Sequence, residues 1–351
     1  MEIKELLELT ISRKASDLHL IVGVAPTIRI DGELVALTSE SVVTPEIIER
    51  DLSQVLTAVQ FETLKKDKEL DFSLAFSDKA RFRVNAYMQK GSFAVAFRTI
   101  PLEIPQIDAL GLPNIMHQFT SLKQGFILVT GPTGHGKSTS LAAMLEEINS
   151  QRSEHIITIE DPIEFVFTPK RSIISQREMK LDTHSWPIAL KSTLREDPDV
   201  VLVGEMRDRE TISSALTVAE TGHLVFATLH TNSAAQTVDR IVDVFPEEQQ
   251  DQVKLQLSNV LEAVVSQRLL PAIEGGRVLA HEIMLATTAI RTSIREGKTH
   301  QIDSIIQTSS EVGMNTLESS LADLILGGKI SMETARSYAV RPEQLNRLIN
   351  R

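Results

Sequence analysis

The amino-acid sequence predicts an α/β protein of two domains, the second of them built on a mostly parallel sheet. From Gln124 onward, short apolar strands alternate with helical segments, which is typical of a parallel sheet covered by helices on both faces. The segment before residue 100 has a different pattern, in which short strands follow one another through tight turns. The length of 351 residues also exceeds that of an average single domain.

Composition and charge exclude several classes of protein. The chain contains no cysteine, which rules out disulfides and thiolate metal sites and agrees with a reducing cytoplasm. No apolar run approaches the ~18 residues that a membrane-spanning helix needs, and the charged, amphipathic N-terminus lacks the form of a secretory signal. The net charge of −11, the interspersed basic residues and the aromatic content of 4% disfavour direct binding of nucleic acid.

The first hundred residues are expected to form a small α/β unit. Apolar runs at Leu18–Val22 and Thr27–Ile30 precede the pair Asp31-Gly32, which suits a tight turn into Glu33–Leu37 because glycine accepts positive φ. The segment Thr44–Leu64 has the pattern of a helix, with a proline near its start.

Two further strands, Arg81–Gln89 and Ser92–Thr99, are expected to complete this unit. In the first of them Phe82 and Val84 point to one face, and Arg81 and Arg83 therefore point to the other. Taken alone, the exposed arginines are best interpreted as an ordinary solvated sheet face.

Residues 101–113 contain three prolines and are interpreted as a linker between the domains. The strands expected beyond it are Gly125–Thr130, His155–Ile159, Val200–Val203 and Leu224–Thr228. No convincing strand follows residue 285, so the tail is expected to be helical.

A phosphate-binding loop is the strongest motif of the chain. Gly131–Ser138, GPTGHGKS, matches G-x-x-x-x-G-K-[ST], follows the strand Gly125–Thr130 and opens a helical run. Backbone N–H groups of such a loop cradle phosphate, Lys137 reaches the β- and γ-phosphates, and Ser138 ligates Mg²⁺. A chance glycine-rich turn is disfavoured because both flanks are correct. The predicted nucleotide-binding residues are Gly131, Pro132, Thr133, Gly134, His135, Gly136, Lys137, Ser138 and Thr139.

A second motif places carboxylates after the buried strand Val200–Val203. Glu205 and Asp208 follow it directly, and the carboxyl ends of parallel strands are where a ligand binds. Glu205 is predicted to polarise the attacking water or to hold Mg²⁺, directly or through water. Gly204 stands where many P-loop enzymes carry a magnesium-binding aspartate. Because many buried strands end in an acid, this motif alone does not identify a nucleotide site.

Two further segments follow predicted strands. In Thr158–Glu164, Pro162 forces a turn that presents acidic side chains, for which an ordinary acidic turn is an equal alternative. In Gly222–Asn232, His230 comes at the sheet edge where the γ-phosphate should lie, although a structural histidine is the commoner interpretation. The acidic residues presented are Glu160, Asp161 and Glu164.

Together these elements resemble the secretion-type ATPase superfamily with a RecA-like core, and more closely its pilus-retraction members. The resemblance covers nearly the whole chain, with the motifs in the family's order. Besides the segments above, they are ASDLHL (Ala15–Leu20), IRIDGEL (Ile28–Leu34), RFRVN (Arg81–Asn85), VSQRLLP (Val265–Pro271) and AIRTSIREGK (Ala289–Lys298). Related extension and type II secretion ATPases usually carry a tetracysteine zinc element, which a chain without cysteine cannot form.

The resemblance implies a PAS-like N-terminal domain (1–100), the linker (101–113), a RecA-like ATPase core (114–288) and a helical C-terminal region (289–351). It also implies a homohexamer in which arginines of one subunit reach the nucleotide of the next. The activity implied is Mg²⁺-dependent ATP hydrolysis that powers type IV pilus retraction from the cytoplasmic side, against an inner-membrane platform protein. Catalytic roles are expected for Glu205, Glu164, His230, Arg83, Arg98 and Arg195, with Arg81 a further arginine candidate.

Three alternatives stay open at this stage: an extension or type II secretion ATPase, a nucleic-acid translocase, and an assembly ATPase that only switches partner binding. Two departures from the family pattern stand out, His135 for a serine and Thr292-Ser293 for Asn-Leu. The segment Ala289–Lys298 is expected to form a helix that docks a partner through Ile290 and Ile294, with Arg291 and Arg295 as a basic stripe beside them. The alternative is that both isoleucines anchor this helix to its own core.

Overall fold

The computed structural model describes residues 2–30, 32–76, 80–100 and 103–350. The chain divides into two compact units, one comprising residues 1–103 with 162–166 and the other residues 104–161 with 167–351. Each unit has its own sheet and its own core. The mixed α/β fold expected from the sequence is therefore confirmed.

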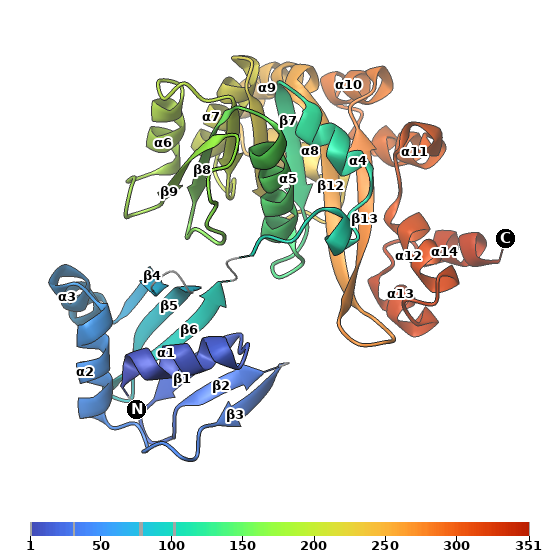
Figure 1. Cartoon of the computed structure of the whole chain (residues 1–351). Coiled ribbons are helices and arrows are strands. Elements are labelled where there is room, and N and C mark those ends of the chain that lie inside the picture. Colours follow the sequence, from blue (N-terminus) through green and yellow to red (C-terminus); the bar gives the residue numbers. More distant parts are fainter. Residues whose placement is uncertain (1, 31, 77–79, 101–102, 351) are drawn as a thin grey trace. The chain divides into compact units, whose positions relative to one another are not determined.

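The first unit is built on an antiparallel six-stranded sheet of order β3-β2-β1-β6-β5-β4. Its helices pack on the face that carries Leu18, Phe82 and Phe97, all fully buried. Its elements are α1 (Ile3–Ser12), β1 (Asp17–Ile21), β2 (Thr27–Ile30), β3 (Glu33–Ala36), α2 (Pro45–Val55), α3 (Ala58–Asp67), β4 (Glu69–Phe76), β5 (Ala80–Gln89) and β6 (Ser92–Ile100) (Figure 1).

The single helix expected over Thr44–Leu64 is two helices. The chain is extended at Leu56, and Thr57 begins α3 with a capping box in which its hydroxyl accepts the Gln60 N–H and Gln60 bonds back to the Thr57 N–H. Strand β4, which pairs with β5 along its length, was not predicted. Of the predicted turn, Asp31 lies outside the described residues, as does Pro101 of the linker, while Gly32 has the expected positive φ of 90°.

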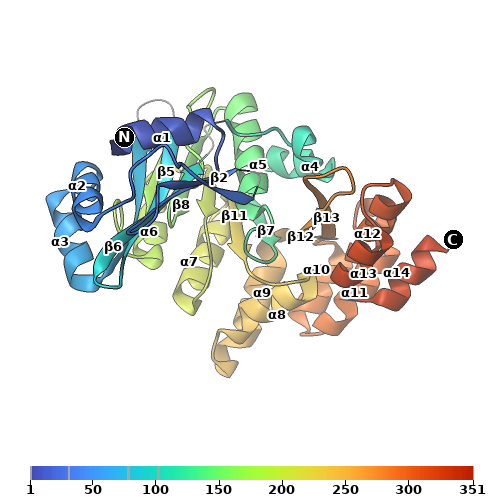
Figure 2. The same cartoon turned by 90° about the horizontal axis from the view of Figure 1, so that it is seen from below.

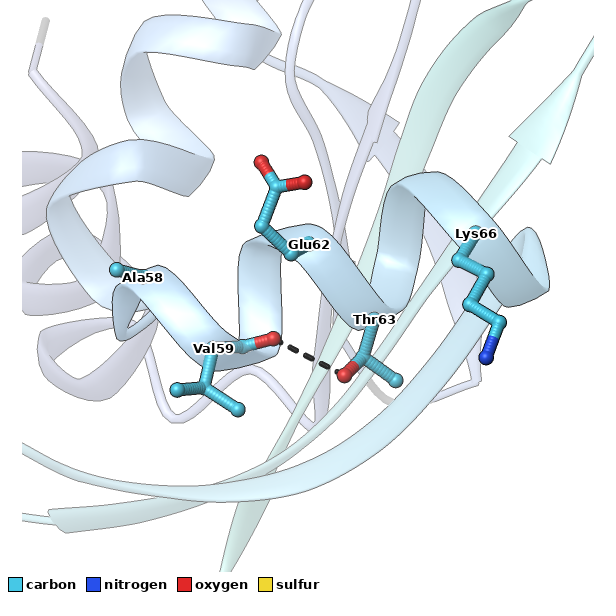
Figure 3. Close-up of a pocket in the computed structure, with 5 residues that line it drawn as sticks. All are labelled: Ala58, Val59, Glu62, Thr63 and Lys66. Atoms are coloured by element: carbon cyan, nitrogen blue, oxygen red, sulfur yellow. Dashed lines mark hydrogen bonds between the residues drawn. The ribbon is translucent and has the colours of Figure 1, made fainter.

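Helix α3 borders a surface hollow of the first unit (Figure 3). All five of its lining side chains come from this one helix, and Val59 among them is 78% exposed. The Thr63 hydroxyl is used within the helix, since it donates to the Val59 carbonyl at 3.0 Å. The hollow contains none of the predicted site residues.

The second unit is built on a seven-stranded sheet of order β13-β12-β7-β11-β10-β8-β9, in which every neighbouring pair is parallel except β12 and β13. Its strands are β7 (Gly125–Thr130), β8 (His155–Glu160), β9 (Ile173–Glu178), β10 (Val200–Val203), β11 (Leu224–Leu229), β12 (Leu261–Pro271) and β13 (Arg277–Leu285). The four strands expected here are confirmed, whereas β9, β12 and β13 were not predicted.

Helices cover both faces of this sheet (Figure 1). They are α4 (Ile115–Ser121), α5 (Lys137–Gln151), α6 (Trp186–Thr193), α7 (Arg209–Glu220), α8 (Ala234–Asp243) and α9 (Glu247–Val260), with a 3₁₀ turn at Asp108–Leu110. Strands β7, β10 and β11 are completely buried between them. A parallel sheet buried on both faces explains their continuous apolar sequences.

The tail is helical, as expected. It forms α10 (Thr288–Arg295), α11 (Ile302–Thr308), α12 (Leu317–Leu326), α13 (Met332–Tyr338) and α14 (Pro342–Ile349). Helices α12 to α14 form a small core with Leu270 and Ala280 of the β12–β13 pair, and they gather at that side of the unit (Figure 2). No helix among the described residues combines the length and apolarity required to cross a bilayer.

The prediction that α10 docks a partner through Ile290 and Ile294 is wrong. Ile290 and Ile294 are 0% exposed and belong to the main core of the second unit, and Ser293 is buried with them. Arg291 is also held within the chain, since it donates to the Ser258 carbonyl and to Glu262 Oε1, each at 2.8 Å. The alternative interpretation, a helix anchored to its own core, is confirmed.

Candidate nucleotide-binding site

The phosphate-binding loop leaves the carboxyl end of β7, a fully buried strand between β12 and β11. Gly131, Gly134 and Gly136 have φ values of 139°, 80° and 82°, which side-chain-bearing residues rarely adopt. Helix α5 begins directly after them at Lys137. Positive-φ glycines leading into a helix N-terminus turn backbone N–H groups inward, which is the arrangement that binds a phosphate.

This loop lies against β12. A Cβ added to Gly131 would lie 2.5 Å from the Gln267 carbonyl oxygen, and one added to Gly136 would lie 3.3 Å from a methyl carbon of Leu269. Gln267, fully buried, also donates from Nε2 to the Ser140 hydroxyl at 2.7 Å. Glycine is therefore required at position 131 by this close approach as well as by its backbone angle.

Lys137 places its ammonium inside the loop. The side chain is only 8% exposed, and Nζ donates to the carbonyl oxygens of Gly131 at 2.8 Å and Pro132 at 3.1 Å. Its third close partner is His230 Nδ1 at 3.4 Å. A buried cation with positive-φ glycines and a helix N-terminus around it fits the β- and γ-phosphates of a nucleotide.

Glu205 follows β10 and is held by cationic and neutral donors. Arg207 donates to both carboxylate oxygens, at 2.6 and 2.7 Å, and His230 Nε2 lies 3.0 Å from Oε1. Burial alone would raise the pKa of Glu205, but the Arg207 hydrogen bond and the charges of Arg207 and Lys137 outweigh it and lower the pKa. Glu205 is therefore a carboxylate at neutral pH.

His230 connects Lys137 with Glu205. Burial and the Lys137 charge lower the pKa of His230, although Glu205 opposes them, so the ring is neutral at neutral pH. Because a carboxylate only accepts, Nε2 carries the proton and donates to Glu205, and Nδ1 accepts from Lys137. The three residues come from α5 and from the ends of β10 and β11, which are adjacent strands.

The residues present fit a magnesium ion that keeps most of its water. A Cβ at Gly204 would lie 3.1 Å from the Ile159 carbonyl oxygen and 3.2 Å from Glu160 Cα, so the usual aspartate would crowd the backbone of β8 here. Among the described residues no three His, Asp or Glu side chains are grouped to hold a metal. Ser138 in the first turn of α5, with Glu205 through water, would suffice because Mg²⁺ retains water and binds nucleotide phosphates.

Two predicted residues lie away from this cluster. Asp208 caps α7, accepting from the Thr211 N–H at 2.8 Å. Arg195 is exposed on the connection into β10, where Asp197 and Asp199 bond to His155, the first residue of β8. That is the amino edge of the parallel sheet, opposite to the loop, so Arg195 does not face the nucleotide site of its own chain.

The other candidates belong to the first unit. Glu164 lies in the segment 162–166 that groups with it. Arg83 and Arg98 are opposite each other on β5 and β6, on the sheet face that the helices leave uncovered. Arg98 is 69% exposed and donates to Asp17 at 2.9 Å, whereas Arg83 makes no hydrogen bond or ion pair with the described part of the chain. Catalytic roles for these three residues stay predictions.

The sequence analysis missed Arg207 and Gln267. Arg207 lies between the predicted residues Glu205 and Asp208, but no periodicity in this irregular loop indicates that its side chain folds back to Glu205. Gln267 lies within VSQRLLP, and its contact with the loop depends on the unpredicted pairing of β12 with β7.

The fold and this loop define a P-loop nucleotide-binding protein. Over residues 2–275 the chain matches the family model of type II/IV secretion system proteins, and it belongs to that family. The resemblance drawn from the motifs is thereby confirmed.

The chain is similar over nearly its whole length to proteins of type IV pilus retraction and twitching motility. The chain is 48% identical over 347 residues to the type IV pilus retraction ATPase PilT of Pseudomonas aeruginosa, covering 98% of this chain and 99% of that one. It is 48% identical over 326 residues to a twitching motility protein of Neisseria gonorrhoeae, covering 92% and 86%. A crystal structure of the pilus retraction motor PilT with bound ADP superimposes with a TM-score of 0.93 at 47% identity, covering 99% of each chain.

Proposed function

We propose that this chain is the ATPase that powers retraction of type IV pili. The observation that carries the proposal is the complete phosphate-binding loop, whose buried Lys137 is joined through His230 to Glu205. Its near full-length similarity to a retraction ATPase, and to a retraction motor crystallised with ADP, supports the same conclusion.

The site's own residues account for binding and hydrolysis. The loop amides and Lys137 bind the β- and γ-phosphates and stabilise the charge that develops on the transferred phosphoryl group. Glu205, ionised and fixed by Arg207 and His230, accepts a hydrogen bond from the attacking water and orients it. Magnesium, when bound by Ser138, neutralises charge on the phosphate oxygens. Hydrolysis then changes the contacts of the loop, which drives movement of one unit against the other.

Deleting the gene tests the function directly. Cells without this protein are expected to extend pili that never retract and to lose twitching, and restoring the wild-type gene recovers both. Fluorescently labelled pili measure extension and retraction separately. Pili that fail to extend would favour an extension ATPase instead, and an ATPase rate that rises with DNA in a salt-sensitive manner would favour a translocase.

The proposal includes a homohexamer at the cytoplasmic face of the inner membrane, working against the platform protein of the pilus machine. Arg83 is exposed and carries no partner within the described part of its chain, which suits an arginine that serves a neighbouring subunit. Arginine supplies a rigid fork of donors for γ-phosphate charge, which lysine cannot do.

Mixed rings test the arginine contact. Arg83→Ala and Lys137→Ala subunits, each inactive alone, are expected to regain part of the ATPase activity when combined, because some mixed interfaces hold both intact groups. Steady-state phosphate release from rings verified to contain both subunits is the measurement. Mixed rings with no activity would place the contact within one chain and remove the argument for a shared site.

A further inference from the structure

His135, one of the departures from the family pattern, makes a contact that the phosphate-binding chemistry does not require. Its Nδ1 accepts the Leu269 backbone N–H at 2.9 Å, across 134 positions of sequence. The ladder between β7 and β12 ends at the pair Thr130 and Ser266. Beyond it, β12 faces the phosphate-binding loop instead of a strand, and the imidazole supplies the acceptor that β7 no longer provides.

Other contacts between the loop and β12 do not replace this one. Gly131 and Gly136 only pack against Gln267 and Leu269, and the bond from Gln267 to Ser140 holds the helix rather than the loop. The bond from Leu269 to His135 is therefore a polar tether that holds the loop itself to β12.

The tether depends on a neutral imidazole. Burial first, then the charges of Arg268, Lys137 and Arg277, lower the pKa of His135. These cations come from β12, α5 and β13. At neutral pH Nδ1 therefore keeps its lone pair for the Leu269 N–H. A protonated ring would have no acceptor and would add a positive charge beside Lys137.

We propose that His135 is a positioning residue, which holds the phosphate-binding loop to β12 through the Leu269 N–H and thereby sets the affinity of the loop for nucleotide phosphates. The proposal rests on the loop binding nucleotide, as proposed above. It predicts which side chains can replace the histidine. Asparagine carries Oδ1 the same number of bonds from Cα as Nδ1 and accepts without titrating, whereas the hydroxyl of serine lies one bond nearer the backbone.

The test compares the full-length wild type with His135→Ser and His135→Asn. The matched control is His300→Asn, because His300 is an exposed histidine in the tail. The first measurement is amide hydrogen exchange of the peptide containing Leu269 without nucleotide, and the second is the dissociation constant for ADP. We expect the serine variant to exchange faster at Leu269 and to bind ADP about fivefold more weakly, the effect of one net hydrogen bond. The asparagine variant should recover most of both losses.

Acidification gives an independent measurement. Between about pH 7.5 and about pH 5.5, ADP affinity should fall further for the wild type than for His135→Asn, because only the histidine loses its acceptor on protonation. Protonation of ADP itself changes the affinity of both proteins equally, so it does not contribute to the difference between them.

Two results would overturn the proposal. One is a serine variant whose Leu269 exchange and ADP affinity match the wild type, and the other is an asparagine variant that recovers neither. A wild type that does not bind ADP at all would instead refute the proposed function, and the exchange of Leu269 without nucleotide would still decide whether the tether exists.

Discussion

Replacing Lys137 by alanine is expected to abolish ATP hydrolysis, with kcat falling by at least about 10²–10³-fold, the loss found when a donor to developing negative charge is removed. Lys137 is the one cationic side chain of the loop, because His135 is held neutral. Its ammonium is already inside the loop, within 3.4 Å of His230. Phosphate release under saturating ATP, with binding of ADP measured in parallel, gives the effect.

The control for this variant is Lys191→Ala, which removes an exposed lysine from α6 and should leave the rate unchanged. Both variants should assemble as the wild type does, since the Lys137 ammonium donates to carbonyl oxygens of its own loop and lies beside His230. If Lys137→Ala still hydrolyses ATP within about tenfold of the wild-type rate, another cation carries the phosphate charge, and the assignment of the loop is wrong.

The phosphate-binding loop and its strand could be predicted from sequence because local rules determine them. A buried run, glycines at fixed spacing and a helix start follow one another, so Gly125–Thr130 and the start of α5 are found without tertiary information. The same holds for β5, in which buried and less buried residues alternate from Ala80 to Ala86.

Strand β12 could not be predicted in this way. Helix α9 passes into it between Val260 and Leu261 without a glycine or proline to mark the change. The segment then mixes apolar residues with Ser266, Gln267 and Arg268, which gives no clear period. What makes it a strand is pairing with β7 on one side and β13 on the other, which is a property of the folded chain.

The error on α10 has a different physical cause. An apolar stripe formed by Ile290 and Ile294 indicates that one face of a helix is buried, but not whether its own core or another protein buries it. Here α9 and the main core cover that face. The link between Glu205, His230 and Lys137 was predictable only in part, because no local pattern indicates the strand order, in which β11 lies between β7 and β10.

Replacing Glu205 by glutamine is expected to lower kcat about 10²–10⁴-fold while ATP binding changes little, because the change removes water-orienting or general-base help and leaves the phosphate contacts in place. Glutamine keeps the size of the side chain. The carboxylate accepts two hydrogen bonds from Arg207 and one from His230 on its two oxygens, whereas the amide nitrogen of glutamine cannot accept any. Single-turnover hydrolysis measures the chemical step, and binding of a fluorescent ATP analogue measures affinity.

The matched control is Glu210→Gln. Glu210 is an exposed acid in the first turn of α7 that pairs with Arg209 at 3.3 Å, and the rate of this variant should equal the wild-type rate. The pKa of Glu205 is lowered, so its carboxylate persists to more acidic pH than that of an ordinary glutamate. Protonation of Glu205 therefore removes activity only below the usual value of 4.5, and the rate near neutral pH should not follow its titration. Normal hydrolysis by Glu205→Gln would move the water-orienting role to the acidic turn of Thr158–Glu164 and would overturn the assignment made for Glu205.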